Sequence, residues 1–116
     1  PAAGSGFGPA VRRRLAQTVQ ERLDVGLRPA ELAEAVGMSP VSFARAFRRA
    51  FGCSARRWLA DQRLRSAAQR LVHGGEPVGE VAAQAGFANP SQFARRFRTL
   101  FGLSPAEYRL QHAGGG

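Results

Sequence analysis

The sequence predicts an all-α fold in which two helix-turn-helix subdomains are joined by a long linker helix. The first observation is an internal repeat: Pro40 to Gly52 aligns without a gap with Pro90 to Gly102, at an offset of 50 residues. Two copies are too few for a solenoid and indicate a duplicated module. The second observation is that phenylalanine recurs every four residues in both copies, the spacing of one apolar stripe on a helix. The third is that no alternating run of β-branched residues predicts a strand.

Each repeated segment carries its own helix start and stop signals. Ser39 and Asn89 are favourable N-cap residues, and a proline follows each at the first helical position, where a missing N–H costs nothing. Gly52 and Gly102 end the two segments as the glycines expected just past a helix. We therefore expect helices over 40–51 and 90–101.

The two faces of these helices differ in chemistry. At about 100° per residue, the phenylalanine stripe lies on one face and a basic and polar set lies roughly opposite. The stripe consists of Phe43, Phe47, Phe51, Phe93, Phe97 and Phe101. The opposite face consists of Val41, Ser42, Arg45 and Arg48 in the first copy and Ser91, Gln92, Arg95 and Arg98 in the second. The phenylalanines are expected in the core, which leaves the basic face exposed.

A shorter helix is predicted before each repeated segment. Pro29 opens one that stops at Gly37, and Pro77 opens another that stops at Gly86. A short turn after each glycine leads into the repeated helix. Two helices joined in this way form a helix-turn-helix, whose second helix enters the DNA major groove.

The remaining segments complete the chain. Val11 to Asp24 has apolar residues at four-residue intervals and is expected as an amphipathic helix. Residues 54 to 73 form one connecting helix, and Ser104 to Glu107 is a capping box that starts a last helix. The expected organisation is a flexible linker or tail over 1–9, a first helix-turn-helix subdomain over 10–53, a linker helix over 54–74, a second helix-turn-helix subdomain over 75–112 and a disordered tail over 113–116.

Positive charge is concentrated on the repeated helices. The chain has a formal net charge of +9, and all 17 basic residues are arginine. No acidic residue occurs over 35–60 or over 81–106, which hold five and three arginines respectively. A basic surface localised in this way is expected to bind a polyanion. The run from Arg12 to Arg14 is instead expected mainly as a solvated face near a helix start.

Catalysis, metal binding and membrane insertion find no support in the sequence. The single Cys53 excludes an internal disulfide and a cysteine-rich zinc site. His73 and His112 lie far apart near predicted helix ends, with no acid or cysteine arranged to complete a triad or a metal site. No apolar run approaches the ~20 residues of a membrane span, and no signal peptide is visible. We therefore expect no enzyme activity, cofactor, metal or membrane partner, and a cytoplasmic location.

From about Pro29 to Arg109 the sequence resembles the DNA-binding domain of bacterial AraC/XylS-type transcription regulators. The residues that carry the resemblance are Arg63, Ala67, Leu71, Val81-Ala82, Gly86-Phe87, Phe93, Phe97-Arg98, Phe101-Gly102, Ser104-Pro105 and Tyr108-Arg109. The resemblance implies seven helices and sequence-specific binding to double-stranded DNA, with helices 40–51 and 90–101 in neighbouring major grooves. It implies a promoter or operator as the target and RNA polymerase as a further candidate partner. Family members usually carry a separate effector or dimerisation domain, and the Gly-, Ala- and Pro-rich start is typical of a linker cut from a longer chain.

Site residues follow from the resemblance and from the helix faces. Transferred by position, the base contacts are Val41, Ala44 and Arg45 in the first copy and Ser91, Gln92 and Arg95 in the second, with Ser42 added from the same face. Because Val41 and Ala44 are small, the first helix is expected to read through Arg45 and thymine methyl groups. Pro90 stands where relatives can carry a polar contact residue, so no base contact is assigned to it. The phosphate contacts expected are Ser39, Arg48, Arg49, Asn89 and Arg98.

Two alternative functions are weighed against this interpretation. A non-specific nucleic-acid-binding module could use the same basic faces on RNA, but the phenylalanines fall on the core face and leave no exposed aromatic for base stacking. The chain could also be the DNA-binding part of a repair protein. The alkyl-transfer chemistry of such proteins uses additional cysteines, and Cys53 is the only cysteine present.

Overall fold

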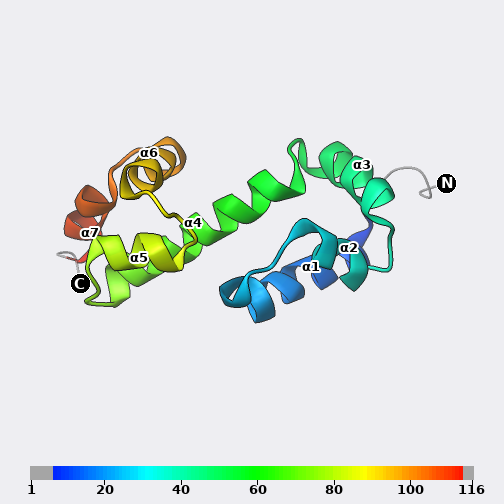
Figure 1. Ribbon diagram of the computed structural model, residues 1–116, viewed down its shortest axis with the longest axis horizontal. Helices are drawn as coiled ribbons and strands as arrows, with labels where there is room; N and C mark the ends of the chain where they lie inside the picture. The colour runs from blue at the N-terminus through cyan, green and yellow to red at the C-terminus, as the bar shows by residue number, and fades with distance from the viewer. Residues whose placement is uncertain (1–6, 114–116) are drawn as a thin grey trace. The chain divides into compact units, whose positions relative to one another are not determined.

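The computed structural model describes residues 7–113 of the 116-residue chain, and over that range it contains only helices and their connections (Figure 1). The helices are α1 (Pro9–Arg22), the 3₁₀ turn η2 (Leu23–Val25), α2 (Pro29–Ala35), α3 (Pro40–Phe51), α4 (Ala55–His73), α5 (Val78–Gln84), α6 (Pro90–Phe101) and α7 (Pro105–Ala113). The predicted all-α fold with seven α-helices is confirmed for the described range. Residues 1–6 and 114–116, which are parts of the tails expected over 1–9 and 113–116, lie outside the described range. The chain divides into two compact units at Gln62 and Arg63, inside α4.

The first unit begins earlier than the sequence pattern predicts. Helix α1 starts at Pro9 rather than at Val11, and Phe7 before it is buried. The Phe7 ring stacks on Phe43 at a centroid distance of 5.6 Å. Phe7 is therefore part of the core and Pro9 is part of a helix, although both fall within the range 1–9 that was expected as a flexible linker or tail. Composition alone suggested a linker there, because Gly, Ala and Pro surround this one aromatic residue.

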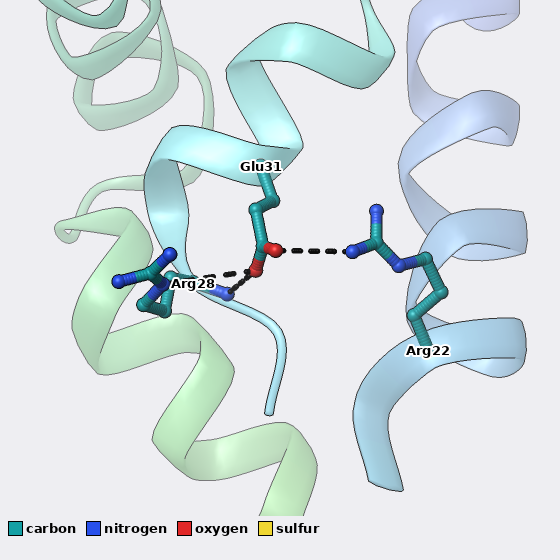
Figure 2. A network of polar contacts seen from close by, with 3 residues as sticks. All are labelled: Arg22, Arg28 and Glu31. Carbon is teal, nitrogen blue, oxygen red and sulfur yellow. Dashed lines mark hydrogen bonds and ion pairs between the residues drawn. The ribbon is translucent and has the colours of Figure 1, made fainter. Parts of the chain in front are cut away.

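Helices α1 and α2 are tied together by one carboxylate, as Figure 2 shows. Glu31 of α2 lies between two arginines: its carboxylate meets Arg22 of α1 at 3.0 Å and accepts the backbone N–H of Arg28 at 2.8 Å. The hydrogen bond from Arg28 is the main cause that lowers the pKa of Glu31, and the Arg22 charge adds to it. This contact caps the start of α2, the helix that packs against α3.

Aromatic rings form the core of the first unit. Phe43 and Phe47 of α3 are buried, and Phe51 stacks on Phe47 at 4.2 Å. Trp58 of α4 meets the Phe47 ring edge-on at 5.4 Å. The predicted phenylalanine stripe is thus the surface through which α3 packs on the rest of its unit.

The second unit repeats this arrangement beyond the end of the sequence repeat. Phe93 and Phe97 of α6 are buried, and Tyr108 of α7 meets Phe97 edge-on at 5.3 Å. Tyr108 stands 50 residues after Trp58, the offset of the repeat. The duplicated module therefore includes the start of the helix that follows α3 and of the helix that follows α6, where an aromatic ring closes each core.

Helix α4 belongs to both units. Ala55 and Leu59 are buried in the first core, whereas Leu64, Ala67 and Leu71 are buried in the second. The expected linker helix thus contributes side chains to both cores. Among the described helices, none combines the length and apolar character that crossing a membrane would require.

Candidate nucleic-acid interface

The two helix-turn-helix turns have the same backbone geometry. Gly37 has a φ of 72° and donates its N–H to the carbonyl of Glu34 at 3.1 Å, while Met38 donates to Ala33 at 2.9 Å. In the second unit Gly86, with a φ of 92°, donates to Ala83 at 3.0 Å, and the next N–H donates to the carbonyl five residues back. A positive φ favours glycine, and these bonds satisfy carbonyls at the end of the preceding helix. The turn thereby fixes where each recognition helix starts.

The side chains of Ser39 and Asn89 cap the recognition helices, as predicted. The hydroxyl oxygen of Ser39 accepts the backbone N–H of Ser42 at 3.2 Å. The side-chain oxygen of Asn89 accepts the N–H groups of Ser91 at 2.8 Å and Gln92 at 3.4 Å. Because capping uses only the acceptor oxygens, the Ser39 hydroxyl proton and the Asn89 amide protons remain as donors. Both residues can therefore cap a helix and contact a phosphate.

All residues predicted as base contacts are exposed. On α3 these are Val41, Ser42, Ala44 and Arg45, and on α6 they are Ser91, Gln92 and Arg95. The predicted phosphate contacts Arg48, Arg49 and Arg98 are exposed as well. Arg96, on the side of α6 nearer the core, is half-buried. Each unit therefore presents one continuous exposed face made of the expected residues.

The arginines of these faces differ in their partners. Within residues 7–113, no hydrogen bond or ion pair holds the side chains of Arg45, Arg48 or Arg95. Arg98 instead lies 3.9 Å from Glu107 of α7, in a pair whose two side chains are both well exposed. Such an exposed pair is weak, on the order of 0–1 kcal/mol. The guanidinium of Arg98 can thus exchange Glu107 for a phosphate at little cost.

Further arginines beside α3 were not predicted as site residues. The guanidinium of Arg12 lies 5.0 Å above the ring centre of Phe51, at the end of α3. Arg56 and Arg57 are exposed in the first turn of α4. In the sequence, the only sign of Arg56 and Arg57 was the lack of acidic residues over 35–60. Arg12 differs from the neighbouring arginines only in its contact with Phe51.

Titratable residues form no other site in the described part of the chain. No group of three His, Cys, Asp or Glu side chains there is placed to hold a metal ion. Cys53 is a half-buried free thiol between α3 and α4. The arrangement offers hydrogen-bond donors and positive charge, which is the chemistry of polyanion binding.

Comparison with known proteins agrees with this geometry. A family profile described as a helix-turn-helix domain matches residues 32–111. The virulence regulon transcriptional activator VirF of Yersinia enterocolitica is 30% identical over 104 residues, 90% of this chain and 38% of that protein. The transcriptional activator NphR of a Rhodococcus species is 36% identical over 101 residues, 86% of this chain and 30% of that protein. The chain spans less than two fifths of the length of these relatives.

Solved structures show the same fold. The DNA-binding domain of AdpA, a global transcriptional factor solved in complex with a target DNA, has 33% identity and a TM-score of 0.69, covering 87% of this chain and 94% of that one. An AraC-type transcriptional regulator from Chromobacterium violaceum has a TM-score of 0.82 at 22% identity, covering 92% of this chain and 96% of that one. The chain therefore belongs to the AraC-type helix-turn-helix family of DNA-binding transcription regulators.

Proposed function

We propose that this chain is the part of a transcription regulator that binds double-stranded DNA in a sequence-specific manner, with α3 and α6 in successive major grooves. The observation that carries the proposal is the matched pair Arg45 and Arg95. They stand at the same position of the two copies, both are exposed, and neither side chain has a partner in the described structure. A guanidinium held on the outer face of a recognition helix is the group that most often contacts guanine in the major groove.

The other exposed residues of the two faces divide by chemistry. Gln92 can donate to and accept from adenine. The hydroxyls of Ser42 and Ser91 can donate to a base acceptor or accept from a base donor. Val41 and Ala44 offer only apolar contact. Arg48, Arg49 and Arg98, with the donors of Ser39 and Asn89, are proposed to hold backbone phosphates, which positions the helices without reading sequence.

The whole protein is proposed to contain more than this domain. The matched region is 38% of one relative and 30% of the other, so a separate effector or dimerisation domain and a contact with RNA polymerase are expected for the whole protein. A regulator of bacterial transcription would act in the cytoplasm, where its promoter lies. The family is one of transcription regulators and is not a class of enzymes.

The test is to isolate the genomic DNA fragments that the purified domain retains and to compare its affinity for them with its affinity for random duplexes and for RNA. We expect about a thousandfold preference or more for the retained fragments, the usual separation of specific from non-specific binding. The double variant Arg45→Ala/Arg95→Ala should lose most of this preference, whereas Arg65→Ala, an exposed arginine in the middle of α4, should keep it. Equal affinity of the unmodified domain for all three nucleic acids would show a non-specific module instead.

A further inference from the structure

Exposed arginines gather at the corner of the first unit where α3 ends and α4 begins. The guanidinium of Arg12, from α1, lies 5.0 Å from the ring centre of Phe51, the last residue of α3. The Phe51 ring also contacts Trp58 of α4, at a centroid distance of 5.5 Å. Arg56 and Arg57 come directly before Trp58, and both are exposed, as is Arg12. The packing around Phe51 therefore brings cations from two helices to the same corner, and we call Arg12, Arg56 and Arg57 the corner cluster.

The guanidinium groups of the corner cluster are not used inside the unit. Within residues 7–113, no hydrogen bond or ion pair holds the guanidinium of Arg12, Arg56 or Arg57. The contact of Arg12 with Phe51 is an attraction between a positive charge and the negative face of a ring, so it does not take up the hydrogen-bonding capacity of the guanidinium. Because this contact restrains a long side chain in advance, less conformational entropy is lost when Arg12 binds a ligand.

The second unit has an acidic residue where α1 has Arg12. The segments before the two helix-turn-helix turns are related by an offset of 49, because the second turn is one residue longer. At this offset the buried Leu15 of α1 corresponds to the buried Leu64 of α4, so α4 takes in the second unit the place of α1 in the first. Arg12 corresponds to Asp61. The repeat therefore did not keep a cation at this position.

The start of the following helix differs in the same direction. At the repeat offset of 50, Ala106 and Glu107 of α7 correspond to Arg56 and Arg57 of α4. Glu107 also lies 3.9 Å from Arg98, the last arginine of α6. The three positions of the corner cluster thus correspond to one alanine and two acidic residues in the second unit. Positive charge at this corner is a feature of the first unit that the duplication does not explain.

A phosphate of a nucleic acid is the ligand that fits the corner cluster. The planar guanidinium presents paired N–H donors that match the oxygens of a phosphate. The cluster also follows Arg48, an exposed arginine one turn before the end of α3, so that one polyanion can contact both. The base edges lie inside the major groove, and the two sugar–phosphate backbones border it. Since these arginines come from α1 and α4 and not from the outer face of α3, they are placed for the border of the groove.

Resting on the proposed function, we propose that the corner cluster is a phosphate-binding site that holds the DNA backbone at the C-terminal end of α3. Ser39 is proposed to contact the backbone at the other end of this helix. The first unit then holds the backbone at both ends of its recognition helix, whereas the second unit has no cluster of this kind. The α3 half-site therefore supplies the larger share of the salt-dependent affinity.

The experiment measures how binding depends on salt. The purified chain is titrated with its selected DNA site and with a random duplex at several salt concentrations. Arg12→Gln should reduce the slope of log K against log salt by about 0.9 on both duplexes, and the triple variant Arg12→Gln/Arg56→Gln/Arg57→Gln by about 2–3. Arg13→Gln, which removes the same charge from the next residue of α1, is the matched control and should keep the slope. A slope that is the same in Arg12→Gln and Arg13→Gln would overturn the site.

Uncharged phosphates then locate the contact on the DNA. Single phosphates of the selected site are replaced by methylphosphonates, which are neutral. At one or two positions beside the α3 half-site, this change should weaken binding of the unmodified chain about tenfold, the value of a hydrogen bond to a charged group. The same change should have less than about a twofold effect on Arg12→Gln, because the partner of that phosphate is already absent. If the methylphosphonate penalty persists in Arg12→Gln at every position, Arg12 binds no phosphate.

Two controls separate these results from other failures. Because Arg12 is exposed, Arg12→Gln should keep the helicity and the melting temperature of the unmodified chain. Failure of the proposed function would appear as equal affinity of the unmodified chain for selected and random duplexes, which the salt slopes do not decide. An unchanged slope in the triple variant would overturn the phosphate site and would point to an acidic protein surface as the ligand of the corner cluster.

Discussion

Arg45 and Arg95 are distinguished from the other exposed arginines by their place in the repeat. Both lie in the second turn of a recognition helix, opposite a fully buried phenylalanine and with no partner for the guanidinium in the described structure. Arg48 shares the lack of a partner but lies one turn further along α3. The position of an arginine on the helix, more than its charge, is therefore expected to decide what it contacts.

Arginine substitutions should separate base reading from phosphate contact. Arg45→Ala and Arg95→Ala should each cost about 1–3 kcal/mol on the cognate site and relax preference at one base pair, because a bidentate contact is lost. Arg48→Ala should weaken binding to cognate and random DNA by the same factor. Titrations of each variant against a set of single-base-pair variants of the site measure both effects. A parallel loss on cognate and random DNA for Arg45→Ala and Arg95→Ala would contradict the assignment of base readers.

Core phenylalanines should affect DNA binding only through the fold. Phe47→Ala and Phe97→Ala each remove a ring that is 0% exposed, and should lower the free energy of unfolding by about 3–5 kcal/mol. Ala44→Ser, an exposed change on the same helix as Phe47, is the control for stability. Thermal melts followed by far-UV circular dichroism measure the loss. An unchanged melting temperature in either phenylalanine variant would show that its ring is not part of a core.

At the residue scale, periodicity could predict which side chains are buried and which are exposed. The four-residue spacing identified Phe43 and Phe47 as core and left Arg45 outside, and both hold in the structure. Phe7 could not be found in this way because an isolated aromatic before a helix has no period. The place of Arg12 over Phe51 depends on how α1 crosses α3, which only the packing decides.

At the scale of elements, the two corners after the recognition helices differ in charge. At the α6–α7 corner, Ser104 and Glu107 form the predicted capping box, with bonds of 2.8 Å and 3.1 Å, and Glu107 also faces Arg98. At the α3–α4 corner Ser54 caps α4 through the N–H of Arg57, which stands in the place of Glu107. An arginine in the first turn of a helix opposes the helix dipole. The cap at the α3–α4 corner should therefore contribute less to stability than the capping box at the α6–α7 corner. Arg57 instead adds positive charge near the end of α3.

Exchanging this one residue should trade DNA affinity for stability. Arg57→Glu can complete the capping box with Ser54 and oppose the charge of Arg48, so it should raise the free energy of unfolding by about 1 kcal/mol. Affinity for cognate and random DNA should fall by a similar factor, because a positive charge near the DNA phosphates is replaced by a negative one. Arg57→Ala separates loss of the cation from gain of the cap. Stability that does not rise in Arg57→Glu relative to Arg57→Ala would contradict this account.

The caps also predict how stability depends on pH. Hydrogen bonds from Ser104, first from its backbone N–H, and the charge of Arg98 hold the pKa of Glu107 below its usual value of 4.5, as Arg28 and Arg22 do for Glu31. A carboxylate with a lowered pKa in the folded state stabilises the fold above the unfolded pKa, and this contribution is lost as the pH falls through the folded value. The melting temperature should therefore decline below about pH 4.5. In Glu31→Gln and Glu107→Gln the melting temperature should decline less steeply than in the unmodified chain. If both variants lose melting temperature as steeply as the unmodified chain, these two carboxylates are not the cause of the decline.

On the scale of the whole molecule, α4 is the element that both cores share. The sequence predicted its extent, because Gly74 and Gly75 end an apolar pattern that begins after Gly52. It did not show that the first turns of α4 are core of one unit and the later turns core of the other, since both read as the same apolar stripe. Which side chains meet Ala55 and Leu59, and which meet Leu64 and Leu71, depends on contacts distant in sequence. We expect a helix shared in this way to make a rigid connection, which is testable through DNA spacing.

The final prediction concerns that spacing. Helix α4 has 19 residues and is about 28 Å long at 1.5 Å per residue, close to the ~34 Å of one DNA turn that separates successive major grooves on one side. Inserting about five base pairs between the half-sites rotates one groove by roughly half a turn, which a helix anchored in both cores cannot follow. Affinity should fall towards that of a single half-site, measured by titration at equal salt with the stoichiometry determined. A duplex with one half-site scrambled supplies the reference value. Unchanged affinity for the spaced duplex, or a requirement for two chains on every site, would show that a single chain does not read both half-sites.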